Sequence, residues 1–254
     1  MRVDLNSDLG ESFGRYTIGM DKEIIPLITS ANVACGFHAS DPVVMQETVR
    51  LAKEAGIQVG AHPGFPDLMG FGRRNMVISR EEAYAYTLYQ VGALDAFLQA
   101  QGGTLQHVKP HGAFYNMAAK DEALSEAICK AIRDYNKELI VLALPAGELY
   151  KAARNLGLRT AAEVFADRAY EEDGTLVNRK KPGAMITEEA EALARIIRMI
   201  KEHKVQAITG KDIDIEVDSV CVHGDGVKAL AFVKNLRDGL TKEGIEICPL
   251  NEFV

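Results

Sequence analysis

Strand-like and helix-like segments alternate about seven times along the 254-residue chain, and this alternation constrains the fold more than any other feature. Asp41 and Pro42 have the residue types of a helix N-terminus, which predicts a helix to about Ala55. Ser79 and Glu82 form a capping box that predicts a long helix ending before Gly102-Gly103. Further helices are expected at 121–136, 146–156, 187–203 and 226–242, with a shorter one near 20–28.

The segments between these helices predict the strands of a parallel sheet. They lie at 3–8, 32–38, 57–62, 105–111, 139–144, 160–167 and 219–225, with a short final strand at 245–250. Strands that alternate with helices are typical of repeated βαβ units, and no linker divides the chain into halves. We therefore predict one domain over residues 1–254. Seven principal strands favour a closed or nearly closed TIM-like (β/α) barrel, and an open doubly wound sheet is the alternative.

Charge and hydropathy exclude two classes of partner. The formal net charge of −7 and the pI near 5.5 argue against nucleic acid, because phosphate binding requires a basic face. No apolar run reaches the roughly 18 residues of a membrane span. The N-terminal MRVDLNSDLGE is too acidic for a signal peptide, so a cytoplasmic location is predicted. The four cysteines form no C-x-x-C pair and are expected to be buried and reduced.

Polar residues recur at every second position in most of the predicted strands. In the first strand Asp4, Asn6 and Asp8 share one face, whereas Val3 and Leu5 share the other. The same alternation groups Asn32 with His38, Gln58 with His62, His107 with Lys109 and His111, Glu163 with Asp167, and Cys221 with His223 and Asp225. Buried polar groups need partners, so a polar barrel interior indicates a site. At its C-terminal mouth we expect Asp8, His38, His62, His111, Asp167 and His223 to converge.

Two kinds of chemistry suit these residue types. Asp8, His38 and His62 are carboxylate and imidazole groups that suit a divalent metal such as zinc. The same residues also suit metal-free acid–base catalysis, with Lys109 or Arg168 holding an anion. No H-E-x-x-H motif and no phosphate-binding P-loop is present. The sequence alone leaves both possibilities open.

Two connections are too long for simple turns, at 63–78 and 168–186. They carry the basic clusters Arg73-Arg74 and Arg179-Lys180-Lys181. Both leave the C-terminal end of a predicted strand, so both are expected to overhang the mouth. Arginine makes bidentate hydrogen bonds with carboxylates and phosphates, and we predict such contacts here.

The sequence resembles the LamB/YcsF family, the 5-oxoprolinase A subunits, through essentially its whole length. The resemblance is carried by NSDLGE (6–11), NVACGFHASDP (32–42), VGAHPGFPD (59–67), GFGRR (70–74), VKPHGAFYN (108–116), EVFADRAYEEDGTLVNRKKPGA (163–184) and VHGD (222–225). It implies a barrel related to the glycoside hydrolase/deacetylase superfamily. It also implies ATP-dependent hydrolysis of 5-oxo-L-proline (pyroglutamate) to L-glutamate, in a complex with partner subunits B and C and with ATP as co-substrate.

With this reaction in view, we expect Asp8, His38, His62 and His111 to position or deprotonate the nucleophile. Lys109 and Arg168 would hold the substrate carboxylate or the developing oxyanion. Further substrate contacts are expected from Asn6, Arg73, Glu163 and His223. Two alternatives remain: a stand-alone metal-dependent deacetylase or amidohydrolase, and a non-catalytic subunit that only binds substrate.

Overall fold

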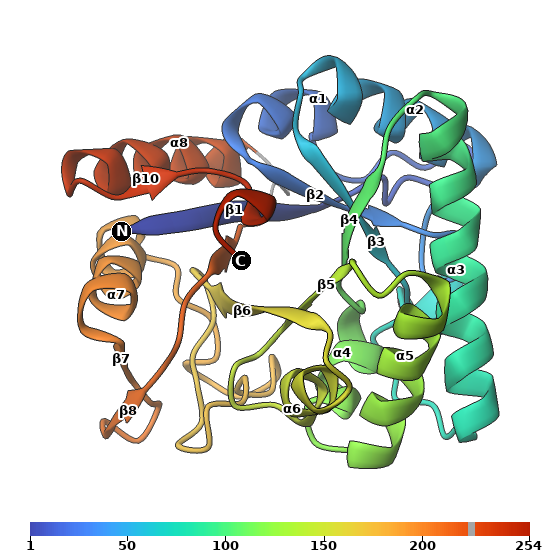
Figure 1. The fold of residues 1–254 in the computed structure, drawn as a ribbon. Coiled ribbons are helices and arrows are strands. Elements are labelled where there is room, and N and C mark those ends of the chain that lie inside the picture. The colour runs from blue at the N-terminus through green and yellow to red at the C-terminus, as the bar shows by residue number, and fades with distance from the viewer. Residues whose placement is uncertain (223–226) are drawn as a thin grey trace.

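The computed structural model describes residues 1–222 and 227–254 and contains a parallel barrel surrounded by helices (Figure 1). The barrel strands are β1 (Arg2–Leu9), β2 (Ser30–Ala34), β3 (Gln58–His62), β4 (Leu105–Val108), β5 (Ile140–Ala143), β6 (Arg159–Phe165) and β9 (Ser219–Cys221). The helices are α1 (Asp21–Ile24), α2 (Pro42–Glu54), α3 (Arg80–Ala100), α4 (Gly112–Ala118), α5 (Glu122–Tyr135), α6 (Glu148–Asn155), α7 (Glu189–Glu202) and α8 (Val227–Lys242). Three short 3₁₀ segments lie at Ile25–Leu27, Leu68–Gly70 and Leu250–Glu252.

The seven barrel strands are all parallel and follow one another in chain order. Each strand from β1 to β6 pairs with the next, β6 pairs with β9, and β9 pairs back with β1. This last pairing closes the barrel and confirms the predicted fold class over the open-sheet alternative. The short β10 (Glu246–Ile247) adds to β1 at its start, and β7 (Lys204–Gln206) forms an antiparallel pair with β8 (Asp212–Asp214) outside the barrel.

The hydrophobic core lies between the barrel and its helices. Val3 and Leu5 of β1 are fully buried in it, as are Val33, Val59 and Val108 of the next strands. These residues alternate with the polar residues of the same strands, as the sequence pattern predicts. Stability from apolar burial therefore comes mainly from the outer face of the barrel, and the inner face is left for polar side chains.

The predicted helix starts are confirmed by their capping hydrogen bonds. The Asp41 carboxylate accepts from the backbone N–H groups of Val43 and Val44 at 2.8 and 3.0 Å, with Pro42 as the first helical residue. Before α3, the Ser79 hydroxyl accepts from the Glu82 N–H and the Glu82 carboxylate accepts from the Ser79 N–H. All four cysteines are buried and free, as expected.

Several predicted strands are shorter than expected, and α4, β7 and β8 were not predicted. The predicted strand 32–38 is observed at Ser30–Ala34 and 105–111 at Leu105–Val108, and of the predicted strand 219–225 the structure describes Ser219–Cys221 as a strand, while residues 223–225 lie outside the described residues. Gly36 and Ser40 have φ angles of 92° and 74°, which an extended strand does not allow. Pro110 lacks an N–H for a strand ladder, and α4 begins directly after His111. Lys109 and His111 therefore follow β4 rather than belonging to it, and α4, β7 and β8 are additions to the predicted elements.

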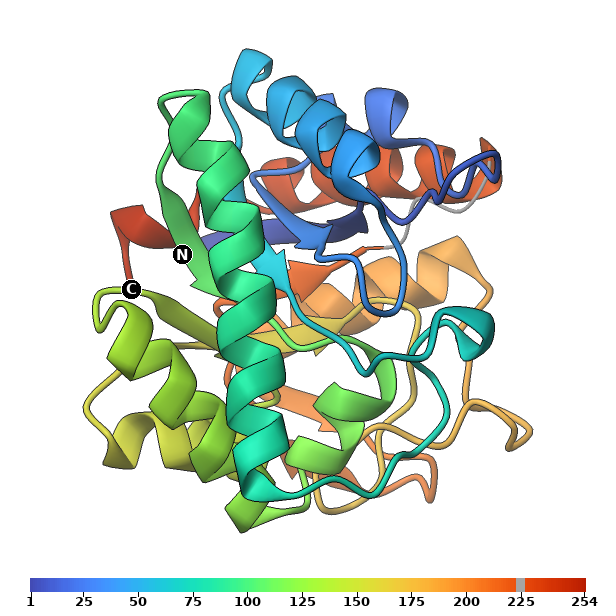
Figure 2. The ribbon, with the colours of Figure 1, turned by 90° about the vertical axis from the view of Figure 1, so that its right-hand side faces the viewer.

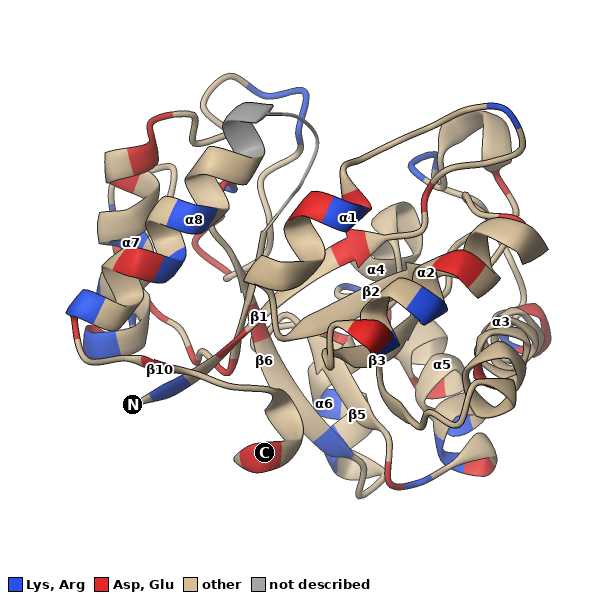
Figure 3. Ribbon diagram, turned by 90° about the horizontal axis from the view of Figure 1, so that it is seen from above, with Lys and Arg blue, Asp and Glu red and all other residues tan. Residues whose placement is uncertain are grey.

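The two long loops meet on one side of the molecule. Segments 63–78 and 168–186 line the same cavity, and Figure 2 shows them, in teal and gold, on the side opposite to both chain termini. Both signs of charge are interspersed along the exposed helices α1, α2 and α7 in Figure 3. Within the described ranges, no helix combines the length and the apolar character that a membrane crossing requires.

Candidate active site

The deep part of the barrel interior is a network of polar side chains. Asn32 donates from its side-chain amide to the side-chain oxygens of Asn6 at 2.7 Å and Asp8 at 2.9 Å. His107 bonds through its two ring nitrogens to the side-chain oxygens of Asn32 at 2.7 Å and Gln106 at 2.9 Å. Burial, and then the charge of Lys109, lower the pKa of His107 to about 3. Both ring nitrogens of His107 are used in buried hydrogen bonds, so its role is structural.

Lys109 lies above this network as a buried cation between two carboxylates. Its Nζ is 2.8 Å from Asp8 Oδ1 and 2.8 Å from Glu163 Oε1. Burial opposes the charge, but Asp8, then Cys221 and Glu163, raise the pKa of the ammonium well above its usual value. Its three N–H donors are used by hydrogen bonds to Asn6 Oδ1, Asp8 Oδ1 and Cys221 Sγ. Lys109 is therefore suited to fixing Asp8 in place.

Glu163 is held from its other side by a residue that the sequence reasoning missed. The Tyr115 hydroxyl donates to Glu163 Oε2 at 2.7 Å, and both side chains are buried. Tyr115 lies on α4, a helix of seven residues. Its position within the block that resembles the family was the available signal, but the helix itself is too short to show a clear period.

Backbone carbonyls fix the orientation of two histidines at the mouth. His62 Nδ1 lies 2.7 Å from the carbonyl oxygen of Lys109, and His111 Nε2 lies 2.9 Å from that of Phe71. A carbonyl only accepts, so these two nitrogens carry the protons. The remaining nitrogens, His62 Nε2 and His111 Nδ1, then face each other at 2.9 Å. Two lone pairs repel at this distance, so the contact requires either a proton or a metal ion between the rings.

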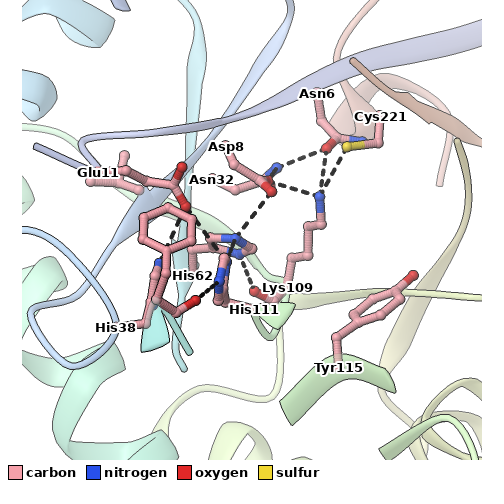
Figure 4. A network of polar contacts seen from close by, with 12 residues as sticks. Asn6, Asp8, Glu11, Asn32, His38, His62, Lys109, His111, Tyr115 and Cys221 are labelled. Atoms are coloured by element: carbon pink, nitrogen blue, oxygen red, sulfur yellow. Dashed lines mark hydrogen bonds and ion pairs between the residues drawn. The ribbon is translucent and has the colours of Figure 1, made fainter. Parts of the chain in front are cut away.

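Two further ligand groups point to the same place (Figure 4). Glu11 Oε1 lies 3.5 Å from His111 Nδ1 and 3.4 Å from His38 Nε2. The His38 ring is fully buried and stacks on His111 with 3.7 Å between ring centroids. Neither ring nitrogen of His38 has a hydrogen-bond partner within residues 1–222 and 227–254. A buried imidazole without hydrogen bonds is costly unless another group satisfies it.

The four residues Glu11, His38, His62 and His111 fit a divalent metal. Their ligand atoms all lie within 4.8 Å of one another. Two ligands that are each about 2.1 Å from an ion lie about 3.0 Å apart at a right angle and about 3.4 Å apart at the tetrahedral angle. The 2.9 Å between the two facing nitrogens matches the first spacing, and the 3.4–3.5 Å to Glu11 matches the second. A metal ion would also satisfy His38.

The structure brings some of the sequence-predicted residues together and separates others. Asp8, His38, His62 and His111 come together, and Asp8 Oδ2 lies 3.3 Å from His62 Nε2, beside the four-residue cluster. Asn6 and Glu163 contact Lys109 and are not among the residues that line the cavity. The predicted site residue His223, and Asp225 of the same predicted strand face, lie outside the described residues. Glu11 was missed because Gly10, with φ of 68°, ends the alternation before it.

A cavity of about 1050 Å³ opens above the cluster. Its inner part is lined by Asp8, His62, Lys109 and His111. Its outer part is lined by both long loops, which contribute Arg73, Arg74, Arg168, Arg179, Lys180 and Lys181. The predicted position of the loops over the mouth is therefore confirmed. The cavity combines an inner region of carboxylate and imidazole groups with a basic outer region.

Comparison with known proteins identifies relatives over the full length of the chain. The chain is 64% identical over 252 residues to the 5-oxoprolinase A subunit of Clostridium beijerinckii, with 99% of both chains covered. It is 56% identical over 254 residues to the 5-oxoprolinase A subunit of Pyrococcus horikoshii, with 100% of both covered. Among solved structures, a lactam utilization protein from Thermus thermophilus superimposes with a TM-score of 0.92 and 47% identity, over 98% of this chain and 99% of that one. The model of the LamB/YcsF family matches residues 3–254, and the chain belongs to this family.

Proposed function

We propose that the chain is the A subunit of an ATP-dependent 5-oxoprolinase, which hydrolyses 5-oxo-L-proline to L-glutamate together with partner subunits B and C. The names of the relatives support a lactam substrate and the existence of partner subunits. The observation that carries the proposal is the convergence of Asp8 with three histidines and Glu11 at the floor of one cavity. Such a set of acid–base and ligand groups suits the hydrolysis of an amide.

The proposed reaction uses ATP because a lactam amide is stabilised by resonance and its ring closes favourably. Transfer of the γ-phosphoryl group to the lactam oxygen releases ADP and makes the ring carbon electrophilic. One water adds to this carbon, the carbon–nitrogen bond breaks, and the nitrogen takes a proton. The resulting acyl phosphate is hydrolysed by a second water to inorganic phosphate and glutamate.

Asp8 is the proposed proton acceptor for the attacking water. Lys109 and Asn32 fix its Oδ1, and its Oδ2 faces His62 at the cavity floor. This arrangement orients the carboxylate while leaving it at the cavity. In this proposal Lys109, Asn6 and Glu163 position Asp8 rather than touching substrate. Arg73 lines the cavity next to Phe71, with its guanidinium carbon 4.9 Å from the ring centroid, and would hold the substrate carboxylate.

Glu11, His38, His62 and His111 are the proposed ligands of a divalent metal. A divalent ion there supplies Lewis acidity toward a carbonyl oxygen. The set shares His38 and His62 with the one predicted from the sequence, while Asp8 is placed beside it as the base. Metal analysis of the purified chain tests this assignment: the wild type should retain about one ion per chain, and Glu11→Gln and His38→Ala should lose it. Equal metal content in all three would remove these residues from the ligand set.

Turnover by the reconstituted complex tests the function itself. Asp8→Asn, His62→Ala and His111→Ala should each lower glutamate formation by at least about 10²-fold, because each removes a group at the reacting centre. His203→Ala, which changes an exposed histidine at the end of α7, is the matched control and should leave the rate unchanged. Near-wild-type turnover in the three site variants would rule out catalysis at this cavity. A change in KM without a change in kcat would instead favour a subunit that only binds substrate.

One observation favours a second candidate function, a metal-dependent hydrolase that acts without ATP. The complete Glu-His cluster lies within this single chain and needs no partner subunit. Assays of the isolated, metal-loaded chain on 5-oxoproline and on acetylated amides, without ATP, separate the two functions. Hydrolysis that is abolished by a chelator would favour the second candidate.

A further inference from the structure

Arg168 is a buried cation at the cavity that has no carboxylate partner among the described residues. Its side chain is 4% exposed, and Nη2 donates to the carbonyl oxygen of Val177 at 2.6 Å. Its Nε makes no hydrogen bond, and no carboxylate of the described residues lies within 4.0 Å of the guanidinium. Burial, and then the charge of Arg179, lower the pKa of Arg168 to about 10, and the charge of the neighbouring Asp167 offsets only part of this shift. An arginine buried beside another cation requires an anion to offset its desolvation.

The other cations of the outer cavity differ in whether they are already neutralised. Arg74 pairs with Asp67, and Lys181 pairs with Glu171 at 2.8 Å. Arg179 and Lys180 line the same cavity as Arg168 and form no ion pair with any described residue. The outer cavity therefore concentrates unneutralised positive charge in a chain whose net charge is −7. This surplus suits an anion with more than one negative charge.

The size of the cavity also leaves room for a second group. A 5-oxoproline molecule is one five-membered ring with one carboxylate, which fills only a small part of about 1050 Å³. In the proposed function, the inner cluster would bind the ring and the carbonyl group of 5-oxoproline, and Arg73 would bind its carboxylate. Arg168, Arg179 and Lys180 remain without a function in the proposed hydrolysis.

We propose that Arg168, Arg179 and Lys180 form a phosphoryl-binding subsite in the outer cavity, separate from the inner site for the lactam. Guanidinium groups match the geometry of phosphate oxygens, and an ammonium adds charge. This inference rests on the proposed function, which requires a phosphoryl group near the ring carbon. The group has two sources: ATP bound by this chain, or an already phosphorylated lactam that arrives from a partner subunit. The shared chemistry is the dianionic phosphoryl group.

Calorimetric titration of the full-length isolated chain tests the subsite. The chain is first treated with a chelator and desalted, so that no anion binds through a metal at the inner cluster. Pyrophosphate, ATP and 5-oxoproline are titrated separately into the wild type, Arg168→Gln, Arg179→Gln and Arg133→Gln. Arg133 is a surface arginine outside the cavity that pairs with Asp134, so its variant is the matched control. Arg179 is exposed, so its variant remains informative even if Arg168→Gln does not fold.

Pyrophosphate affinity should fall about tenfold or more in Arg168→Gln and severalfold in Arg179→Gln, with no change in Arg133→Gln. Tighter binding of ATP than of pyrophosphate supports the subsite with ATP as the source. Equal binding of the two supports it with a phosphorylated lactam as the source. The subsite is overturned if the wild type binds neither anion, or if both cavity variants bind them as the wild type does. If the subsite is overturned but the wild type binds 5-oxoproline, the proposed function still stands. If the wild type binds the anions but not 5-oxoproline, the result counts against the proposed function and not against the subsite.

Discussion

Replacement of Lys109 by methionine should strongly destabilise the protein, because the buried Glu163 and the largely buried Asp8 would lose their shared cation. Lys109 Nζ lies 2.8 Å from both Asp8 and Glu163, and the side chains of Lys109, Asp8 and Glu163 are 3%, 15% and 0% exposed. Removal of one partner from a buried ion pair costs about 3–5 kcal/mol. For a chain of this size that corresponds to a fall in Tm of about 10 °C. Urea unfolding followed by circular dichroism, with an unchanged m-value, measures the loss.

A double-mutant cycle with Glu163→Gln shows whether electrostatics causes this loss. Glu163→Gln leaves Lys109 paired with Asp8 and keeps an acceptor for the Tyr115 hydroxyl, so it should cost about 1–2 kcal/mol. In the Glu163→Gln background only one carboxylate is left uncompensated, and Lys109→Met should cost at least about 1 kcal/mol less than in the wild type. Equal costs in both backgrounds, or a Lys109→Met cost below about 1 kcal/mol, would refute the reasoning.

Three further substitutions test the interior and a helix start. Gly60→Ala should destabilise the fold by about 2–4 kcal/mol in urea unfolding, because the added Cβ would lie 2.1 Å from His107 Nε2. Two hydrogen bonds hold the His107 ring in place, so it cannot easily move away. A cost near zero would show that the ring moves freely. Asp4→Asn should remove a pH dependence of the free energy of unfolding. Burial raises the pKa of Asp4 from 3.8 to about 6. The stability that protonated Asp4 contributes is therefore fully present below pH 3.8 and is lost as the pH rises through 6. The wild type should therefore lose about 3 kcal/mol relative to Asp4→Asn between pH 4 and pH 7, and parallel stability–pH curves would contradict this. Ser79→Ala should cost about 1 kcal/mol through loss of the capping box with Glu82, and a double mutant with Glu82→Ala should show non-additive costs.

Alternation along the strands was sufficient to predict the barrel and much of its interior. Asp8 and His62 lie within regular strands, where the period of two determines which side chains face inward. Beyond the end of a strand, the period of two no longer determines which side chains face inward. Glu11 follows a glycine with positive φ, and no residue pattern indicates that its carboxylate turns back to the histidines. His38 was predicted correctly to approach the other histidines, although it belongs to a loop and not to β2.

The sequence could not predict which atoms of the site residues contact one another, for a different reason. The orientation of His62 and His111 depends on carbonyl oxygens of Lys109 and Phe71, which come from different loops. Main-chain acceptors have no residue-type signature, so no pattern in the sequence predicts two imidazole lone pairs 2.9 Å apart. The same holds for the neutralisation of Arg74 by Asp67, which leaves Arg168 as the buried cation with an unsatisfied Nε.

The division of β1 between a mainly apolar outer face and a polar inner face makes the strand sensitive to changes in length. Insertion of one residue after Val3 would exchange the environments of all the following positions, so that Leu5 would enter the polar interior and Asn6 would face the helices. Fold and chemistry would be lost together. The loops at 63–78 and 168–186 have no such parity, so a one-residue change in their length would move side chains around the cavity without exchanging the two faces of a strand.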